Sequence, residues 1–205
     1  MRLEFQVDMQ DLTEIEAALG MTKDKSKLVL RAAINNAAKQ IEKQMVDETN
    51  ATYKFQGRKA GIKSANTIKK ATVGRMEATI KAKGPANELL DFQVSPRTYF
   101  PAGRGAPKWV KSRGRKDRKL TRVARFPSAS GDKYKGFVVK FKSGHLAMVE
   151  RVPGKSMRGK PHKEAIESLY SIATPKMEEV SYRDKIEADV PDILEKCIEA
   201  QIIRF

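Results

Sequence analysis

The chain has 205 residues, of which 40% are hydrophobic and 32% are charged, and its formal net charge is +16. This length is enough for one domain with a buried core, and the composition is that of a globular protein rather than a disordered one. The longest apolar stretches have three or four residues, so we expect no membrane span and no export signal. The single cysteine, Cys197, excludes an intramolecular disulfide and fits a reducing compartment.

The positive charge is concentrated in the middle of the sequence. Residues 54–163 contain 29 Lys and Arg against 6 Asp and Glu, whereas residues 1–53 and 164–205 together contain 12 against 19. A cationic middle between mildly acidic ends can bind a polyanion, and it can also stack on further copies of the chain with opposite charges facing. Charge alone leaves both alternatives open.

The N-terminal half predicts an edge strand and two helices. Residues 3–7 alternate in polarity, and the segment after them predicts a short helix that ends at Gly20. A longer helix is expected to begin at Asp24 or Ser26. Apolar residues at three- and four-residue steps give it one buried stripe: Leu30, Ile34, Ala37, Ala38, Ile41 and Met45.

The region after this helix predicts a loop and then strands. Residues 54–75 are basic and lack a regular period, so we expect a loop with a short helix. Residues 76–83 alternate apolar and polar side chains before Gly84 and Pro85, which is typical of a half-buried strand. A second strand is expected near Phe92 and Val94.

The C-terminal half predicts a β-hairpin and a helix. Residues 137–151 form two short apolar runs around Ser143 and Gly144. Pro191 is tolerated in the following helix only in its first turn or at a kink. The apolar face of that helix contains Ile186, Val190, Ile193, Leu194, Cys197 and Gln201.

These elements predict an α+β fold in one domain, residues 1–205. An antiparallel sheet with a central hairpin is expected to pack against the long helix of the N-terminal half and the C-terminal helix. Residues 97–130 follow neither a helical nor a strand period, and we expect an extended basic loop or insertion there.

The basic loop is the candidate binding site for nucleic acid or another partner. Cations that neutralise phosphates give a strong, salt-sensitive attraction, and Tyr99 and Trp109 can stack on bases. A solvated or protein-docking loop is the other interpretation, because the sequence has no RRM, KH or zinc-finger motif. The candidate residues are Arg104, Lys108, Lys111, Arg113, Arg115, Lys116, Arg118, Lys119, Arg122 and Arg125.

Catalytic and metal-binding motifs are missing, so we expect no enzyme, cofactor or metal. The two histidines, His145 and His162, stand in no metal-binding motif. Gly154-Lys155-Ser156 ends like a phosphate-binding P-loop, but Val149 stands where that motif requires glycine. Cys197 is expected to be a small core residue. The remaining enzymatic hypothesis is a nuclease that uses Asp117, Asp132 and His145.

Five segments of the chain form an ordered set: residues 32–49, 68–73, 75–83, 136–155 and 184–202. Taken in this order, they resemble the prophage minor tail protein Z family, the tail-completion proteins of phages with long non-contractile tails. The resemblance extends over residues 28–203, and its closest local matches are Gly144 with the strand to Arg151, then Gly154-Lys155, Pro161 and Pro191.

The resemblance implies a non-enzymatic virion protein at the head-proximal end of the tail, made in the host cytoplasm and assembled there. Such a protein would form a ring, expected to be a hexamer, and would bind the tail terminator, the tail tube and the head–tail connector. It would join tail to head and contact phage DNA in the lumen. Residues 162–175 are more polar than in the family and are expected to be helical. The alternative is a sequence-nonspecific nucleic-acid-binding protein.

Overall fold

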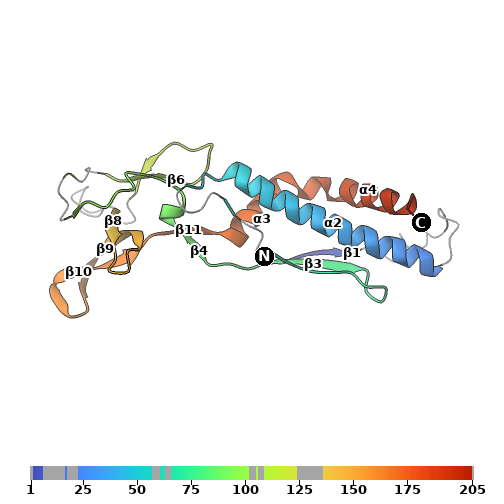
Figure 1. Cartoon of the computed structure of the whole chain (residues 1–205), viewed down its shortest axis with the longest axis horizontal. Coiled ribbons are helices and arrows are strands. Elements are labelled where there is room, and N and C mark those ends of the chain that lie inside the picture. The colour runs from blue at the N-terminus through green and yellow to red at the C-terminus, as the bar shows by residue number, and fades with distance from the viewer. Residues whose placement is uncertain are drawn as a thin grey trace. The chain divides into compact units, whose positions relative to one another are not determined.

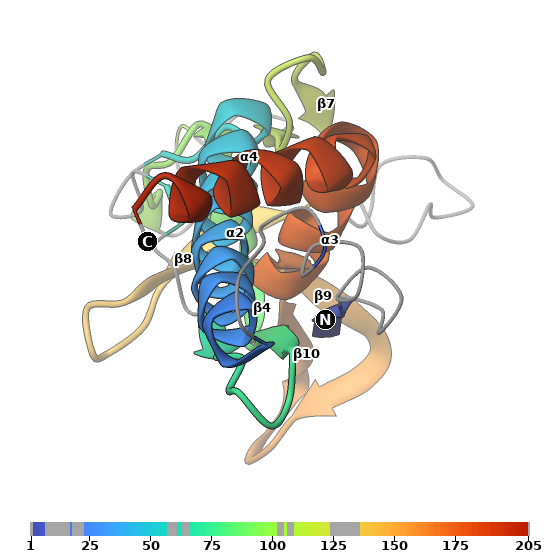
Figure 2. The same cartoon turned by 90° about the vertical axis from the view of Figure 1, so that its right-hand side faces the viewer.

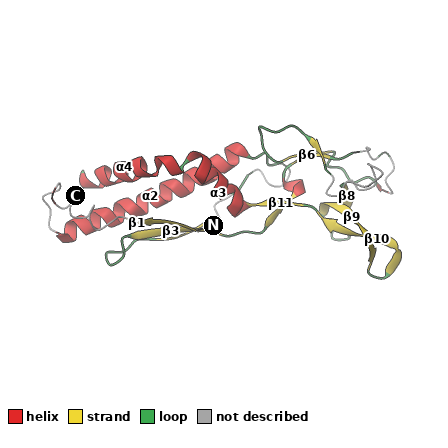
Figure 3. Cartoon of the chain, turned by 180° about the vertical axis from the view of Figure 1, so that it is seen from behind, coloured by secondary structure: helices red, strands yellow, loops and turns green. Residues whose placement is uncertain are grey.

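A computed structural model describes residues 2–6, 17, 23–56, 61–62, 66–101, 105, 109–123 and 136–204. It combines helices with antiparallel sheets, which confirms the α+β prediction (Figure 3). By its internal contacts the chain divides into two compact units. We call residues 1–49, 63–85 and 174–205 the terminal unit, and residues 50–62 and 86–173 the central unit. The prediction that the whole chain is one domain stays a prediction.

The terminal unit is built on helix α2 (Lys23–Thr52), which contributes its residues up to Thr49. All six residues of the predicted apolar stripe are buried, from Leu30 to Met45. Ile34, Ile41 and Met45 join one hydrophobic cluster with Ala78 and Ile80 of a sheet. The helix therefore forms where the sequence places apolar side chains at helical spacing.

The sheet of the terminal unit has the strand order β1-β3-β2, and both pairings are antiparallel. Its strands are β1 (Arg2–Gln6), β2 (Asn66–Lys69) and β3 (Glu77–Ala82). Strands β1 and β3 confirm the predictions for residues 3–7 and 76–83. The prediction of a loop with a short helix over residues 54–75 is wrong for β2, where Ile68 packs on the core between more polar neighbours.

The C-terminal residues form α3 (Thr174–Lys185), the 3-10 turn η3 (Glu187–Asp189) and α4 (Val190–Ile202). Pro191 lies in the first turn of α4, as predicted. The N–H groups of a first turn have no acceptor within the helix, so the N–H that proline lacks is not missed there. Ile186 and Ile193 are buried in the same cluster as Ile41. Helix α2 thus lies between the β1–β3 sheet and α4 (Figures 1 and 3).

The largest sheet of the central unit has the order β10-β9-β8, with β8 (Phe137–Lys140), β9 (Leu146–Met157) and β10 (Lys160–Ser168). The β8–β9 turn confirms the predicted hairpin, and Gly144 adopts φ 83° there. A helix over residues 162–175 was wrong: β10 and β11 (Tyr170–Ala173) occupy most of that segment. Its polar composition reflects strands exposed to solvent rather than a helix face.

The central unit also contains two smaller sheets. Strand β11 pairs with β4 (Ala86–Glu88), which leads through the 3-10 turn η1 (Leu89–Asp91) into the second sheet. That sheet has the order β5-β6-β7, with β5 (Gln93–Ser95), β6 (Lys111–Arg113) and β7 (Thr121–Arg122). Strand β5 confirms the strand predicted near Phe92 and Val94.

Strands β6 and β7 lie inside residues 97–130, so the predicted loop is wrong at these two strands, and the rest of the predicted loop or insertion stays a prediction. Three valines anchor these short strands to the rest of the unit. Val94 and Val110 are buried in a hydrophobic cluster, and Val123 packs against it. Strands of two or three residues are too short to give a period in the sequence. The cluster otherwise contains Leu90, Val138, Met148 and Leu169.

Candidate polyanion-binding surfaces

The two units carry very different charge. The central unit contains 23 Lys and Arg against 7 Asp and Glu, a net +16, while the 18 basic and 18 acidic residues of the terminal unit cancel. The net positive charge of the chain therefore comes entirely from the central unit. A surface with this charge attracts polyanions and acidic partners.

Lys111 and Arg122 place two cations side by side on the β5-β6-β7 sheet. They are direct partners across the β6–β7 pairing, so their side chains leave the same face, and both are exposed. Like charges in this position destabilise a sheet. Among the described residues no carboxylate lies within ion-pair distance of either, so an anion from outside the chain would relieve the repulsion.

Three of the predicted cations are held by the central unit itself. Arg113 donates from Nε to Gln93 Oε1 at 2.8 Å, and Lys116 donates from Nζ to the Asn50 carbonyl at 2.9 Å. Arg115 donates from Nε to Asp117 Oδ1 at 3.1 Å. This hydrogen bond holds the pKa of Asp117 below its usual value. Arg113 and Arg115 thus bond nearby side chains and Lys116 bonds the backbone, which the sequence did not predict.

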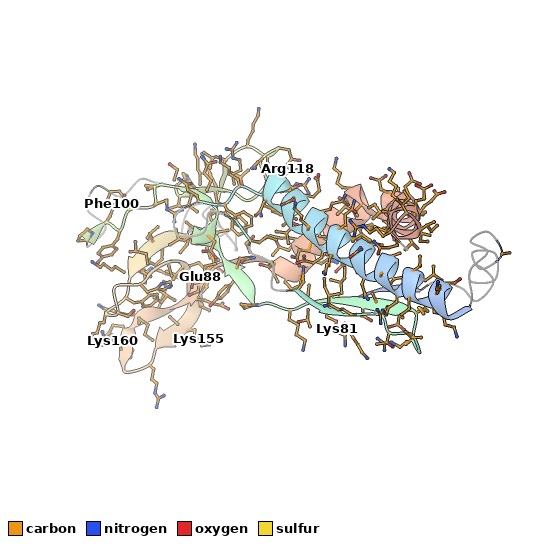
Figure 4. All side chains as sticks on the ribbon, turned by 45° about the vertical axis from the view of Figure 1, so that its right-hand side comes forward. Lys81, Glu88, Phe100, Arg118, Lys155 and Lys160 are labelled. Carbon is orange, nitrogen blue, oxygen red and sulfur yellow. The ribbon has the colours of Figure 1, made fainter. Side chains whose placement is uncertain are left out.

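The remaining predicted cations fall into two groups. Lys111, Arg118, Lys119 and Arg122 are exposed, and no described carboxylate forms an ion pair with any of them; Figure 4 labels Arg118. The positions Arg104, Lys108 and Arg125 lie outside the described residues. Four of the predicted cations are thus exposed without a described ion-pair partner, and their role in binding stays a prediction.

The two aromatic candidates differ in availability. The Arg122 guanidinium lies 4.7 Å from the centre of the Trp109 ring, so one face of that ring already carries a cation. Trp109 itself is half-buried. Tyr99 is 38% exposed. Of the two rings, Tyr99 is therefore the more exposed candidate for base stacking.

A second cationic surface was not among the predicted site residues. Strands β9 and β10 continue beyond the sheet as a two-stranded arm, residues 151–163, which is the orange ribbon in Figures 1 and 2. Its side chains are exposed except for the half-buried Val152 and Met157. The sequence signal was present, because these thirteen residues include five Lys and Arg and no Asp or Glu.

His145 belongs to a small cavity near the β8–β9 turn. Its Nε2 lies 3.1 Å from Glu88 Oε1, and its ring stacks on Phe141 with centroids 6.1 Å apart. The cavity also has Asp91 and Arg97 in its wall. The Arg97 guanidinium donates to the Phe92 carbonyl at 3.2 Å.

Two of the three residues of the nuclease hypothesis have local partners in the described part of the chain. Asp117 accepts from Arg115 and His145 contacts Glu88, while Asp132 lies outside the described residues. No group of three His, Cys, Asp or Glu able to hold a metal occurs among the described residues. Whether the chain is an enzyme is a question that this geometry does not test, so the expectation of no enzyme stays a prediction.

Cys197 packs as the sequence indicated. It is half-buried on α4 against the terminal-unit core, and burial raises the pKa of its thiol. A raised pKa leaves less of the reactive thiolate. None of the described helices is both long and apolar enough to cross a membrane.

Comparison with known proteins adds no relative: no family model, no curated protein and no solved structure matches the chain.

Proposed function

We propose that the chain is a non-enzymatic structural protein of a phage tail that completes the head-proximal end of the tail and joins it to the head. It acts as a ring of copies, with the tail terminator, the tail tube and the head–tail connector as neighbours and phage DNA in the lumen. The resemblance of its ordered segments to the minor tail protein Z family supports the place of action.

The observation that carries the proposal is the separation of charge between the two units. A neutral unit with a continuous core provides a scaffold, and a unit of net +16 provides the contact with a polyanion or an acidic neighbour. The cation pair Lys111 and Arg122 supports this division, since both lack an ion-pair partner among the described residues. Such a division suits an assembly protein that needs no substrate pocket.

The test is assembly of tails from a phage genome in which this reading frame is deleted and resupplied. Electron microscopy and plaque counts compare the wild type with Lys111→Gln, Arg118→Gln and Lys119→Gln combined. The matched control, Lys39→Gln, Lys43→Gln and Lys81→Gln, removes the same charge from exposed sites of the terminal unit.

We expect the deletion to give tails that fail to join heads, the central triple variant to rescue infectivity poorly and the control triple variant to rescue it fully. Complete, infectious particles in the absence of the chain would overturn the proposal. Equal rescue by the two triple variants would show that Lys111, Arg118 and Lys119 have no part in assembly.

A second candidate is a sequence-nonspecific nucleic-acid-binding protein, favoured by the adjacency of Lys111, Arg122 and the Trp109 ring. Its affinity for nucleic acid would fall steeply with salt and would not depend on tail components. Binding that is weak at low salt and insensitive to added salt would exclude this candidate.

A further inference from the structure

The arm, residues 151–163, concentrates cations that its own chain does not neutralise. Lys155, Arg158, Lys160 and Lys163 are exposed, and among the described residues no carboxylate forms an ion pair with them. Within the described part of the chain, the fifth cation, Arg151, does have partners: its Nε lies 4.0 Å from Glu164, and its guanidinium lies over the Phe137 ring. Figure 4 shows Lys155 and Lys160 on the arm.

The arm is a bent ribbon with a fixed root. At its root Val149, Glu150 and Arg151 pair regularly with β10, and Met148 just before them is buried in the hydrophobic cluster. Farther out the register shifts twice, so that residues 153–155 bulge from β9 and residues 161–163 from β10. Bulges bend and twist a strand pair.

Each bulge has the residues that make it possible and also carries a lysine. Pro153 and Pro161 lack an N–H for the ladder, and Gly154 adopts φ 71°. Lys155 and Lys163 stand in the two bulges. The tip between Met157 and Lys160 turns at Gly159, with φ 72°, so that Arg158 and Lys160 flank the turn.

The side chains of the arm fit a nucleic acid better than a protein partner. The cores of protein–protein interfaces are rich in aromatic residues and poor in charge, whereas interfaces with DNA are polar and strongly positive. None of the large exposed hydrophobic side chains of the described residues lies within 151–163. The arm therefore offers charge without an apolar anchor.

The same side chains favour duplex DNA over other nucleic acids. Residues 151–163 contain no Phe, Tyr or Trp, and single-strand binders rely on such rings to stack bases. A two-stranded ribbon enters the major groove of B-DNA, which is about 12 Å wide, but not the narrow major groove of duplex RNA. We propose that this arm binds the backbone of duplex DNA without sequence preference. The inference does not depend on the tail role, since it rests on the arm alone.

The experiment measures binding of the full chain to a fluorescein-labelled 30-base-pair DNA duplex by anisotropy across a salt series. The arm variant combines Lys155→Gln, Arg158→Gln, Lys160→Gln and Lys163→Gln. The matched control combines Lys39→Gln, Lys43→Gln, Lys81→Gln and Lys83→Gln, which lowers the net charge equally at exposed sites of the terminal unit. Circular dichroism checks that all three proteins are folded.

Each lost phosphate contact reduces the slope of log affinity against log salt by about 0.9, so four contacts predict a reduction of about 3.6 in the arm variant. We expect the control to keep the wild-type slope, and single-stranded DNA and duplex RNA to compete less well than duplex DNA. An arm variant with the wild-type slope would overturn the proposal, as would equal losses in arm variant and control.

Two further outcomes would assign the arm to another partner. Better competition by single-stranded DNA or duplex RNA would overturn the choice of duplex DNA. If the arm variant binds the duplex normally but loses self-association in sedimentation velocity, the arm is a protein-docking surface and the proposal fails. If tails join heads without this protein, that result contradicts the proposed function alone and leaves the DNA measurement unaffected.

Discussion

The terminal and central units use their side chains for different purposes. In the terminal unit, Ile41, Ile80 and Ile193 meet in one core, and the basic and acidic residues cancel. The central unit has its own smaller core around Val110 and Met148, yet it carries the whole net charge of the chain. Stability and charge can therefore be altered separately, and substitutions in each unit test that separation.

The largest effects are expected from the two cores. Phe92 is fully buried and stacks on Phe55, with ring centroids 5.3 Å apart, so Phe92→Ala should cost about 3–5 kcal/mol. Ile41 is fully buried in the terminal unit, and Ile41→Ala should cost about 2–5 kcal/mol. Unfolding in urea measures both changes in the free energy of unfolding.

Two signals distinguish the units in that experiment. The single tryptophan, Trp109, reports the central unit by fluorescence, and the helical circular dichroism reports mainly the terminal unit. We expect Phe92→Ala to shift the fluorescence transition more and Ile41→Ala to shift the dichroism transition more. Identical shifts of both signals in both variants would show one cooperative unit and break the comparison.

Two asparagines of α2 provide a matched pair with intermediate effects. The Asn35 amide accepts from the Ala71 N–H at 2.8 Å and donates to the Ala71 carbonyl at 3.2 Å, within the terminal unit. The Asn50 amide does the same with Ile62, at 2.7 and 3.1 Å, within the central unit. Each side chain thus replaces the backbone pairing that a strand would give.

Truncation of either asparagine leaves a partly buried peptide group without its partner. We expect Asn35→Ala and Asn50→Ala each to cost about 1–3 kcal/mol. Thermal melts followed by the same two signals check whether each loss appears in its own unit. A melting temperature unchanged in both variants would mean that water replaces these bonds at no cost.

Sequence reasoning succeeded where a regular pattern of apolar residues, or a clear turn, is present. The stripe from Leu30 to Met45, the alternation around Ile80 and the turn at Gly144 all led to the observed elements. It failed at β6 and β7 because their order comes from distant partners, Val94 and Met148, rather than from a local pattern. It also assigned the polar residues of β10 to a helix. An exposed ribbon buries neither face, so its sequence lacks the alternation of apolar and polar residues that indicates a strand.

The candidate site could be predicted only in part for the same physical reason. Charge density identified the region, but sequence cannot tell a solvated cation such as Lys119 from one that supports the backbone, such as Lys116, which bonds a carbonyl 66 positions away. The arm was missed although its thirteen residues carry five cations and no acid, because no local pattern shows that they form an exposed two-stranded ribbon.

Glu178 offers a smaller effect that depends on pH. It is 1% exposed, and its burial raises the pKa of the carboxyl, with a further increase from Glu42, although a hydrogen bond from Asn66 opposes the shift. Since the folded carboxyl holds its proton to higher pH than the unfolded one, stability falls as pH rises from 4.5 through the raised pKa. Glu178→Gln removes that loss.

The expected result is a melting temperature above the wild-type value at neutral pH, with the difference vanishing below pH 4.5. Calorimetry over a pH series measures it. A constant difference at every pH would assign the effect to packing rather than to charge.

The smallest effect on stability is expected at the surface cations of the central unit. Lys111→Gln, Arg118→Gln and Lys119→Gln change exposed side chains, which typically alters stability by at most about 0.5 kcal/mol each. Replacement that includes Arg113, Arg115 and Lys116 should cost more, because those three bond Gln93, Asp117 and the Asn50 carbonyl.

For Lys111→Gln the direction of the change in melting temperature can also be predicted. It removes a positive charge directly opposite Arg122, so the melting temperature should rise slightly at low salt. The gain should disappear at high salt, where the repulsion is already screened. A fall at both salt concentrations would mean that the Lys111 side chain packs usefully on the sheet. In that case charge and stability would not be separable even at this exposed position.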